Sequence, residues 1–346
     1  MIMPVKKQLI LPENQTMFLQ CHASSLLKIG KNSFLCVFMA GDGEAKPNMS
    51  IWMTKCVNGV WGKPVPVKSV YPLPHWNPVL HMDGEHLILY YLVGQTIASW
   101  YTRVTISKDL GETWTSSREA VPDDHTPRIT SRNKLITLSN GMWLGPCSIE
   151  GETHWDCYVD RSSDKGVHWE KSRIPFTHAP PTTLRNQTVW PGLKEGALSL
   201  DDPAAFFQWD GVIQPTLWES QPGMVHAFMR STRGYVYRSD SSDYGCTWSD
   251  AYPTSLPNNN SGIDLVKLED NHLVLAYNPI QGNWGMRTPL TLAYSKDNGE
   301  SFTHLTDLET DPGEYSYPCI IAQGNNIYVT YTNNRKNIVF FEMSLP

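Results

Sequence analysis

The chain has 346 residues, a formal net charge of −6 at pH 7 and 40% hydrophobic residues. It contains no basic run and no apolar stretch that approaches roughly eighteen residues, so nucleic acid and membranes are poor candidates as partners. Helix-type apolar periodicity is scarce, whereas short alternating apolar runs bounded by Gly, Asn, Asp and Pro recur throughout. This pattern predicts an all-β fold.

The N-terminal segment does not have the pattern of a secretory signal. Lys6 and Lys7 precede a short apolar piece that Glu13 and Asn14 interrupt before a secretory hydrophobic region could form. The seven cysteines are odd in number and form no C-x-x-C pair, which fits a reducing compartment. We therefore expect a cytoplasmic protein in which several of the cysteines lie in strands as buried, unpaired thiols, unless a leader once preceded Met1.

Six hairpins are predicted in chain order, each made of an apolar strand, a short polar turn and a second apolar strand. They span about 23–39, 78–92, 134–145, 215–229, 263–277 and 318–332. Two of the turns contain Asp83-Gly84 and Asn140-Gly141, and such dipeptides are strong hairpin signals.

A second pattern, S-x-D-x-G-x-[TS]-[WF], follows several of these hairpins. Copies begin at Ser107, Ser162, Ser241 and Ser295, and a degenerate copy without the carboxylate begins at Thr54. An Asp that hydrogen-bonds its own turn, a Gly that tolerates positive φ and an aromatic residue beneath describe a tight turn between strands. We call these segments the repeat turns and interpret them as scaffold.

Most copies of the repeat turn lie about fifty residues apart, which is the spacing of propeller blades with four strands. We predict a single domain, residues 1–346, that forms a six-bladed β-propeller in which each repeat turn joins the third and fourth strands of a blade. The N-terminal segment Lys7 to Leu11 is expected to complete the sixth blade. One longer step between copies indicates an insertion at about 172–211.

The predicted strand order places a functional site on the face opposite the repeat turns. First strands begin there and second strands end there, and both carry polar side chains. The first strands contribute His22, Asn77, Arg132 with Asn133, Gln214, Asn260 with Asp264, and Tyr315 with Tyr317. The second strands contribute Asp42 with Glu44, Glu150, Arg230, Asn278 and Arg335, and the approaches to the third strands Arg103, Arg233 and Arg287. Arginines that bind carboxylates, together with amides and acids that bind hydroxyls, suit a sugar carrying a carboxylate.

Some members of this set have simpler explanations. Asn77 and Gln214 precede prolines and could equally cap strand ends, and Arg103 and Arg335 are interpreted as surface or interblade ion pairs. No H-E-x-x-H, paired C-x-x-C or phosphate-binding glycine loop occurs, so we expect neither a metal nor a cofactor.

The repeat turns and several short motifs resemble the sialidase superfamily, in particular its branch with BNR repeats. The resemblance extends from about His22 to Val339. Its motifs include Trp76-Asn77-Pro78-Val79, Ile213-Gln214-Pro215-Thr216, Arg287-Thr288-Pro289-Leu290 and Glu314-Tyr315-Ser316-Tyr317-Pro318. The resemblance implies a six-bladed propeller with its active site opposite the Asp-box turns, which are the repeat turns here.

The resemblance also implies roles for individual residues. Arg230 and Arg287 are expected to hold the substrate carboxylate, with Asn77, Asp264 and Glu314 also binding substrate, and Tyr315 is expected to be the nucleophile. His22 occupies the position of the first carboxylate-binding Arg, and Gln214 that of the Glu which supports the Tyr. For the acid/base, Asp42 and Glu44 lie in the expected loop and Glu44 is preferred. Glu150 is a further candidate to take the proton of the Tyr, and His22 could itself act as an acid/base.

The sequence therefore predicts a sialidase-like glycoside hydrolase that acts on the end of a glycan carrying an acidic sugar such as sialic acid. Two alternatives remain open. One is a uronate-directed lyase or another glycosidase on the same scaffold, and the other is a carbohydrate-binding propeller without catalysis.

Overall fold

The computed structural model describes residues 6–67, 72–179 and 209–345, and within these ranges the chain is built almost entirely of β-strands. The described helix is a single 3-10 turn, Ile97–Ser99. No helix in these ranges is long and apolar enough to cross a membrane. The prediction of an all-β chain is confirmed.

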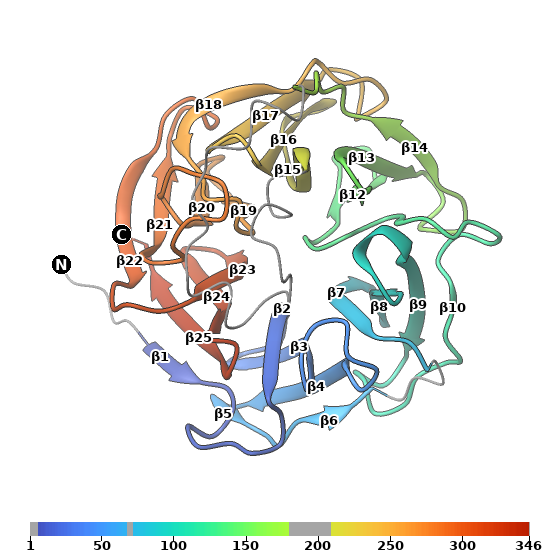
Figure 1. Ribbon diagram of the computed structural model, residues 1–346, viewed down its shortest axis with the longest axis vertical. Helices are drawn as coiled ribbons and strands as arrows, with labels where there is room; N and C mark the ends of the chain where they lie inside the picture. The colour runs from blue at the N-terminus through green and yellow to red at the C-terminus, as the bar shows by residue number, and fades with distance from the viewer. Residues whose placement is uncertain (1–5, 68–71, 180–208, 346) are drawn as a thin grey trace.

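The strands form antiparallel units that follow one another along the chain and lie around a common centre (Figure 1). The first two units contain β2 (Gln20–Gly30), β3 (Ser33–Gly41), β4 (Ser50–Val57), β5 (Val60–Trp61) and β6 (Val65–Pro66), then β7 (His75–Asp83), β8 (His86–Val93), β9 (Tyr101–Ser107) and β10 (Arg118–Glu119). The next two contain β11 (Ile136–Thr137), β12 (Trp143–Glu150), β13 (His154–Ser162) and β14 (Glu170–Arg173), then β15 (Asp210–Gln221), β16 (Met224–Ser231), β17 (Tyr235–Ser241) and β18 (Tyr252–Pro257). The last two contain β19 (Asp264–Lys267), β20 (Leu273–Tyr277), β21 (Leu290–Ser295) and β22 (Thr303–Glu309), then β23 (Tyr315–Gln323), β24 (Asn326–Asn333), β25 (Asn337–Ser344) and β1 (Lys6–Leu9).

Two junctions between units are notable. β13 and β15 pair in parallel over His154↔Asp210 and Trp155↔Gly211, which joins the third and fourth units into one eight-stranded sheet. The N-terminal strand β1 pairs antiparallel with β25, so the prediction that the N-terminal segment completes the last unit is confirmed. Most of the predicted insertion at 172–211 lies outside the described residues.

The six predicted hairpins correspond to the pairs β2/β3, β7/β8, β11/β12, β15/β16, β19/β20 and β23/β24. The third differs from the prediction because β11 is only two residues long. Its partner β12 contains Pro146, which has no N–H to donate to a neighbouring strand. The ladder between β11 and β12 stops at Leu144, and beyond it Ser131 N donates a hydrogen bond to Pro146 O. A proline inside the partner strand thus limits this ladder.

The four repeat turns share one hydrogen-bond pattern. In the first, the Ser107 hydroxyl donates to Asp109 at 2.7 Å and accepts from Gly111 N at 2.7 Å, while Asp109 accepts from Thr113 N at 2.8 Å. The turns that begin at Ser162, Ser241 and Ser295 repeat it. Gly111 has φ +87°, a conformation that favours glycine. The carboxylates of these turns are therefore used locally, as the scaffold interpretation requires.

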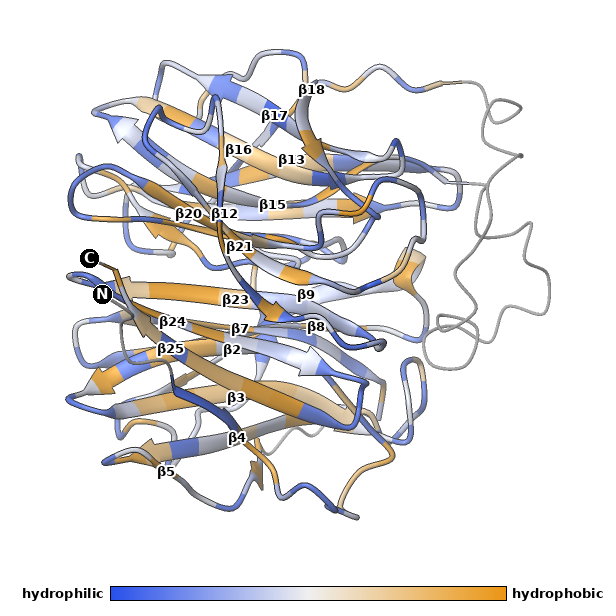
Figure 2. Cartoon of the chain, turned by 90° about the vertical axis from the view of Figure 1, so that its left-hand side faces the viewer, coloured by the Kyte–Doolittle hydropathy of each residue, from blue (hydrophilic) through white to orange (hydrophobic). Residues whose placement is uncertain are grey.

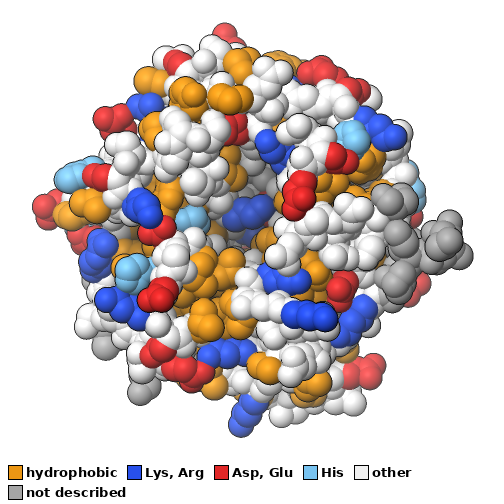
Figure 3. All heavy atoms as spheres, turned by 180° about the vertical axis from the view of Figure 1, so that it is seen from behind, with side chains coloured by type: hydrophobic (Ala, Val, Ile, Leu, Met, Phe, Trp, Pro, Cys, Tyr) orange, Lys and Arg blue, Asp and Glu red, His pale blue; other side chains and the backbone are white. Residues whose placement is uncertain are grey.

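Strand pairing separates the repeat turns from the other end of each sheet. In the second unit, Leu87 pairs with Ser107 next to the turn, whereas Val93 pairs with His75 and Tyr101 at the opposite end. Figure 3 shows the face that carries the turns, where acidic and basic side chains are interspersed around the rim.

The core consists of apolar clusters between neighbouring units rather than one central core. The largest joins β3 and β4 to β7 and β8 and contains Leu35, Met53, Leu87 and Leu89. The edge-on view shows hydrophobic residues running along strands such as β3 and β23 (Figure 2). Burial between sheets leaves the centre of the ring for polar side chains.

Asp160 is expected to be a major determinant of stability. It is 0% exposed, and it accepts hydrogen bonds from Arg128 Nη2 at 2.7 Å and from the backbone N–H of Ile129. Asp160→Ala leaves a buried guanidinium without its main partner, so the free energy of unfolding should fall by roughly 3 to 5 kcal/mol.

The matched control is Glu170→Ala, because Glu170 pairs with Arg161 on the surface. This substitution should lower the free energy of unfolding by less than about 1 kcal/mol. Urea denaturation of both variants and wild type measures the difference. Equal losses would contradict the assignment.

Candidate active site

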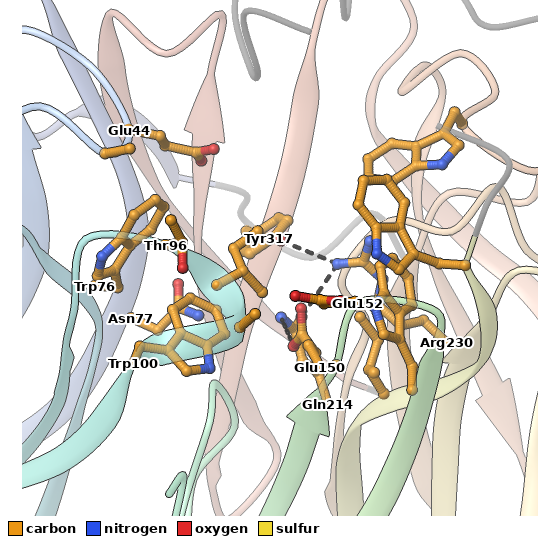
Figure 4. A pocket seen from close by; sticks show the side chains of 18 of the residues that line it. Glu44, Trp76, Asn77, Thr96, Trp100, Glu150, Glu152, Gln214, Arg230 and Tyr317 are labelled. Carbon is orange, nitrogen blue, oxygen red and sulfur yellow. Dashed lines mark hydrogen bonds between the residues drawn. The ribbon is translucent and has the colours of Figure 1, made fainter. Parts of the chain in front are cut away.

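A pocket of about 530 Å³ opens at the end of the sheets opposite the repeat turns. Its polar lining comes from all six units: Glu44, Asn77, Glu150, Glu152, Gln214, Arg230, Arg287, Tyr317 and Arg335. Figure 4 shows Glu150, Glu152 and Gln214 beside Tyr317 and Arg230, with Trp76 and Trp100 on the other side of the pocket. Residues far apart in sequence therefore form one site.

Three of these side chains are aimed by the same backbone device. Asn77, Gln214 and Tyr317 have φ of +44°, +53° and +53°, and each precedes a proline. A register shift follows in each case, between Trp76 and Val79, Ile213 and Thr216, and Ser316 and Cys319. Such a bulge re-aims a side chain, and positive φ at residues other than glycine is a strain that concentrates at functional sites.

Tyr317 lies among guanidinium groups. Arg230 Nη1 donates a hydrogen bond to the Tyr317 hydroxyl at 2.9 Å, and the guanidinium carbons of Arg230 and Arg287 both lie 5.7 Å from the Tyr317 ring centroid. Arg132 Nη2 donates to the Tyr317 carbonyl at 2.6 Å. The phenol thus occupies the positive part of the pocket.

Glu314 holds two of the arginines in place. Its carboxylate accepts from Arg287 Nη1 at 2.6 Å and from Arg335 Nε at 3.0 Å. Burial by itself would raise the pKa of Glu314, but the charges and hydrogen bonds of Arg335 and Arg287 keep it below its ordinary value. Arg335 also donates to Glu44 Oε1 at 2.7 Å, so Arg287, Glu314, Arg335 and Glu44 form one chain of ion pairs.

Glu150 differs from the other carboxylates of the pocket. It is 5% exposed and has only weak partners, with Ser148 Oγ at 3.3 Å and Gln214 Nε2 at 3.4 Å. Burial raises the pKa of Glu150 from 4.5 to about 7, and the positive charge of Arg230 offsets only part of that rise. A carboxyl with this pKa can give or take a proton near neutral pH.

The sequence also matches a known protein family. The family model described as "BNR repeat-like domain" matches residues 32–329, most of the chain. The chain belongs to this family. No curated protein matched this BNR repeat-like protein in a sequence comparison.

Solved structures share the fold at low sequence identity. A protein of unknown function from Dyadobacter fermentans is 14% identical, with a TM-score of 0.73 over 99% of both chains. The Hadza microbial sialidase Hz136 is 13% identical, with a TM-score of 0.75 over 98% of this chain and 68% of its own. The NanB sialidase of Streptococcus pneumoniae is also 13% identical, with a TM-score of 0.69 over 98% and 70% of the two chains. This BNR repeat-like protein therefore has a sialidase-like fold.

Six of the residues predicted from sequence line the pocket, namely Glu44, Asn77, Glu150, Gln214, Arg230 and Arg287. Two lie directly behind it. Glu314 positions the arginines, and His22 packs against Tyr317 with ring centroids 4.2 Å apart. His22 is 1% exposed and bonded to Thr332 Oγ1 at 2.8 Å, and burial together with the nearby arginines lowers its pKa well below the ordinary value, so it stays neutral.

Two predicted residues lie elsewhere. Tyr315 is 6% exposed and packs in the apolar cluster with Leu290 and Tyr331, because the bulge that turns Tyr317 into the pocket begins one residue after Ser316. Asp264 is buried and accepts from Lys134 Nζ at 2.7 Å and from Ile320 N at 2.9 Å, so it joins three units instead of reaching the pocket.

Sequence reasoning named Tyr317 beside Tyr315 but gave the role of nucleophile to Tyr315. It interpreted Arg335 as a surface or interblade pair, and Arg335 does pair with Glu44 of the first unit, at the pocket. A signal for Tyr317 was present: Asn77-Pro78, Gln214-Pro215 and Tyr317-Pro318 are the same X-Pro step on three inner strands. Aligning them points to Tyr317 rather than Tyr315. Among the described residues, no cluster of three His, Cys, Asp or Glu could hold a metal ion.

Glu150→Gln is expected to change how stability depends on pH. The folded protein keeps a proton on Glu150 between pH 4.5 and about 7 that the unfolded chain has lost, so the free energy of unfolding falls as pH rises through this window. The amide variant lacks this contribution, which is on the order of 3 kcal/mol. Urea unfolding of both proteins across the window measures it, and parallel pH curves would contradict the raised pKa.

Proposed function

We propose that the protein is a six-bladed β-propeller and an exo-acting glycoside hydrolase for glycans that carry an acidic sugar such as sialic acid. The observation that carries the proposal is the convergence of Arg230, Arg287 and Arg335 on the one pocket that Tyr317 also lines. Buried guanidinium groups in a ligand pocket fit an anionic partner, and their planar donors match a carboxylate.

Arg335 supplies a third guanidinium group to the pocket, although His22 occupies the position expected for the first carboxylate-binding arginine. It reaches the pocket from the turn between β24 and β25, and Glu314 and Glu44 bind its Nε and Nη1. The site therefore has three guanidinium groups although its first strand carries a histidine. With His22 neutral, the carboxylate of the sugar is held by arginines alone.

The reaction would use Tyr317 and Glu150. The sugar carboxylate lies against the arginines. The Tyr317 oxygen attacks the anomeric carbon while its phenolic proton passes to water, and the bond to the leaving-group oxygen breaks as the Glu150 carboxyl gives that oxygen its proton. A water molecule then attacks the glycosyl-tyrosine and gives a proton to Glu150, and the Tyr317 oxygen leaves the sugar and regains its proton from water. Arg230 donates to the Tyr317 hydroxyl oxygen, the atom on which negative charge develops as its proton leaves.

One observation favours a second candidate, a uronate-directed lyase. The Tyr317 hydroxyl accepts a hydrogen bond from Arg230, and no carboxylate among the described residues contacts it. In an elimination, the arginines would neutralise the uronate carboxylate while a pocket base removes the adjacent proton. A lyase product carries a new double bond that absorbs ultraviolet light, whereas a hydrolase product does not.

The test is turnover of a fluorogenic sialoside beside uronate- and rhamnose-terminated oligosaccharides by wild type, Tyr317→Phe and Tyr315→Phe. Tyr317→Phe should lower kcat by roughly 100-fold or more because the attacking oxygen is gone. Tyr315→Phe alters a core side chain and should stay close to wild type. Equal effects of the two substitutions would contradict the role of Tyr317, and silence on every substrate would leave a carbohydrate-binding protein.

The pH profile tests Glu150. Because a general acid must be protonated, kcat/KM should decline as pH rises through about 7, the pKa to which burial raises Glu150. Glu150→Gln should lose activity by roughly 100- to 10,000-fold and lose this limb of the profile. If Glu150→Gln keeps the same decline of kcat/KM at alkaline pH, another group is the general acid, and Glu44 is the next candidate.

A further inference from the structure

A second cluster of polar side chains lies at the other end of the sheets from the pocket. At its centre is His226 on β16, whose cross-strand partners are Trp218 on β15 and Asp240 on β17. The residue before His226, Val225, pairs with Ser241, where a repeat turn begins. The glycosidase proposed above therefore makes no use of this cluster.

Side chains from three neighbouring strands form a chain of hydrogen bonds in this cluster. The Ser220 hydroxyl lies 2.7 Å from His226 Nε2, and His226 Nδ1 lies 2.5 Å from Asp240 Oδ1. An ionised carboxylate can only accept, so Nδ1 carries the ring proton and Nε2 of the neutral ring accepts from Ser220. This is the arrangement of a nucleophile, a general base and an orienting carboxylate. We propose that Ser220, His226 and Asp240 form a second catalytic site, which hydrolyses esters of small acyl groups.

A bulge in β15 brings Ser220 to the imidazole. The register shifts between Glu219 and Gln221, which leaves Ser220 without a cross-strand partner. Such an irregularity re-aims a side chain. The imidazole of His226 is itself held in place, because it stacks on the Trp218 ring with centroids 4.9 Å apart at 27°.

Asp240 is fixed in place and ionised. The Tyr252 hydroxyl donates to Asp240 Oδ2 at 2.7 Å, and Arg238 Nε donates to Oδ1 at 2.9 Å. Burial by itself would raise the pKa of Asp240, but hydrogen bonds from His226, Tyr252 and Arg238 lower it to about 2. The carboxylate therefore holds the proton on Nδ1 and stabilises the imidazolium that forms when Ser220 gives up its proton.

Asn298 supplies a hydrogen-bond donor beside the nucleophile. It belongs to the repeat turn that begins at Ser295. Its Oδ1 accepts from Trp218 Nε1 at 2.7 Å, and its Nδ2 lies 3.1 Å from His226 Nε2, the atom that Ser220 also contacts. An amide donor in this place can stabilise the negative charge that develops on an ester carbonyl oxygen.

The reaction needs water as its single co-reactant. Ser220 Oγ bonds to the ester carbonyl carbon and gives its proton to His226 Nε2, which passes that proton to the alcohol oxygen as the bond to the alcohol breaks. A water molecule then attacks the acyl-serine and gives one proton to His226. The carboxylic acid leaves, and the proton returns from His226 to Ser220 Oγ.

The surroundings of Ser220 fit a short acyl group. Met224 lies two residues before His226, on the same face of β16, and is 37% exposed, so it offers an apolar contact to an acyl methyl group. Ser220 is half-buried and the side chain of Asp240 is 30% exposed, which places the cluster at the surface, where water can reach it. The substrate class is therefore acetyl and similar short-chain esters.

The first test is turnover of p-nitrophenyl acetate. Wild type should release p-nitrophenol over many turnovers, and Ser220→Ala should lower kcat by roughly 100-fold or more because the nucleophile is gone. Asp240→Asn should lower kcat by roughly 100- to 10,000-fold, because the amide no longer holds the proton on Nδ1. The matched control is Ser139→Ala, an exposed serine that donates to Glu219 Oε1 at 3.0 Å and should keep the wild-type rate.

The second test labels wild type with a fluorophosphonate, from whose phosphorus an activated serine oxygen displaces fluoride. Mass spectrometry should find the adduct on Ser220, and Asp240→Asn should form it more slowly. Urea unfolding of Ser220→Ala at the wild-type midpoint excludes misfolding as the cause of lost turnover. The absence of an adduct on Ser220, or equal acetate turnover by Ser220→Ala and Ser139→Ala, overturns the proposal.

Discussion

The buried carboxylate of Glu314 is the interaction on which the site depends. Arg287 and Arg335 carry like charges in a water-poor environment, and each would be unstable there without a counter-charge. Glu314 accepts from both, and Arg335 continues to Glu44. This chain of ion pairs joins the residue before β23, the turn between β24 and β25, the loop before β21 and the loop after β3. Assembling the sheets therefore also assembles the arginine-lined part of the pocket.

A second constraint is the bulge at the start of the inner strands. A strand alternates its side chains between two faces, and a regular strand would not aim Asn77, Gln214 and Tyr317 into one pocket. Positive φ before a proline breaks the alternation at the same place in three units. Burial of the following residues between sheets compensates for the local strain, as expected where strain is kept for function.

The pocket divides its chemistry by position. Its arginines gather around Tyr317, while Glu150 sits away from strong hydrogen-bond donors and keeps its proton to near-neutral pH. The repeat turns use their carboxylates for their own backbone at the other end of the sheets. Carboxylates of the same sequence thus have different roles because of what surrounds them, and a pocket of this kind can bind an anion and still move a proton.

Local pattern determined much of this protein. Alternating apolar runs and turn residues predicted the hairpins, and the repeated Ser, Asp and Gly predicted the turns, because both rest on contacts between residues a few positions apart. The ends of the predicted strands also placed Arg230, Arg287, Glu44 and Glu150 correctly at the pocket. The tertiary structure alone decided the rest. It placed Tyr317 rather than Tyr315 in the pocket, because the bulge after Ser316 changes which side chain of the strand faces inward. It also buried Asp264 against Lys134 and brought Arg335 to Glu314 and Glu44, since ion pairs across units depend on where distant strands meet.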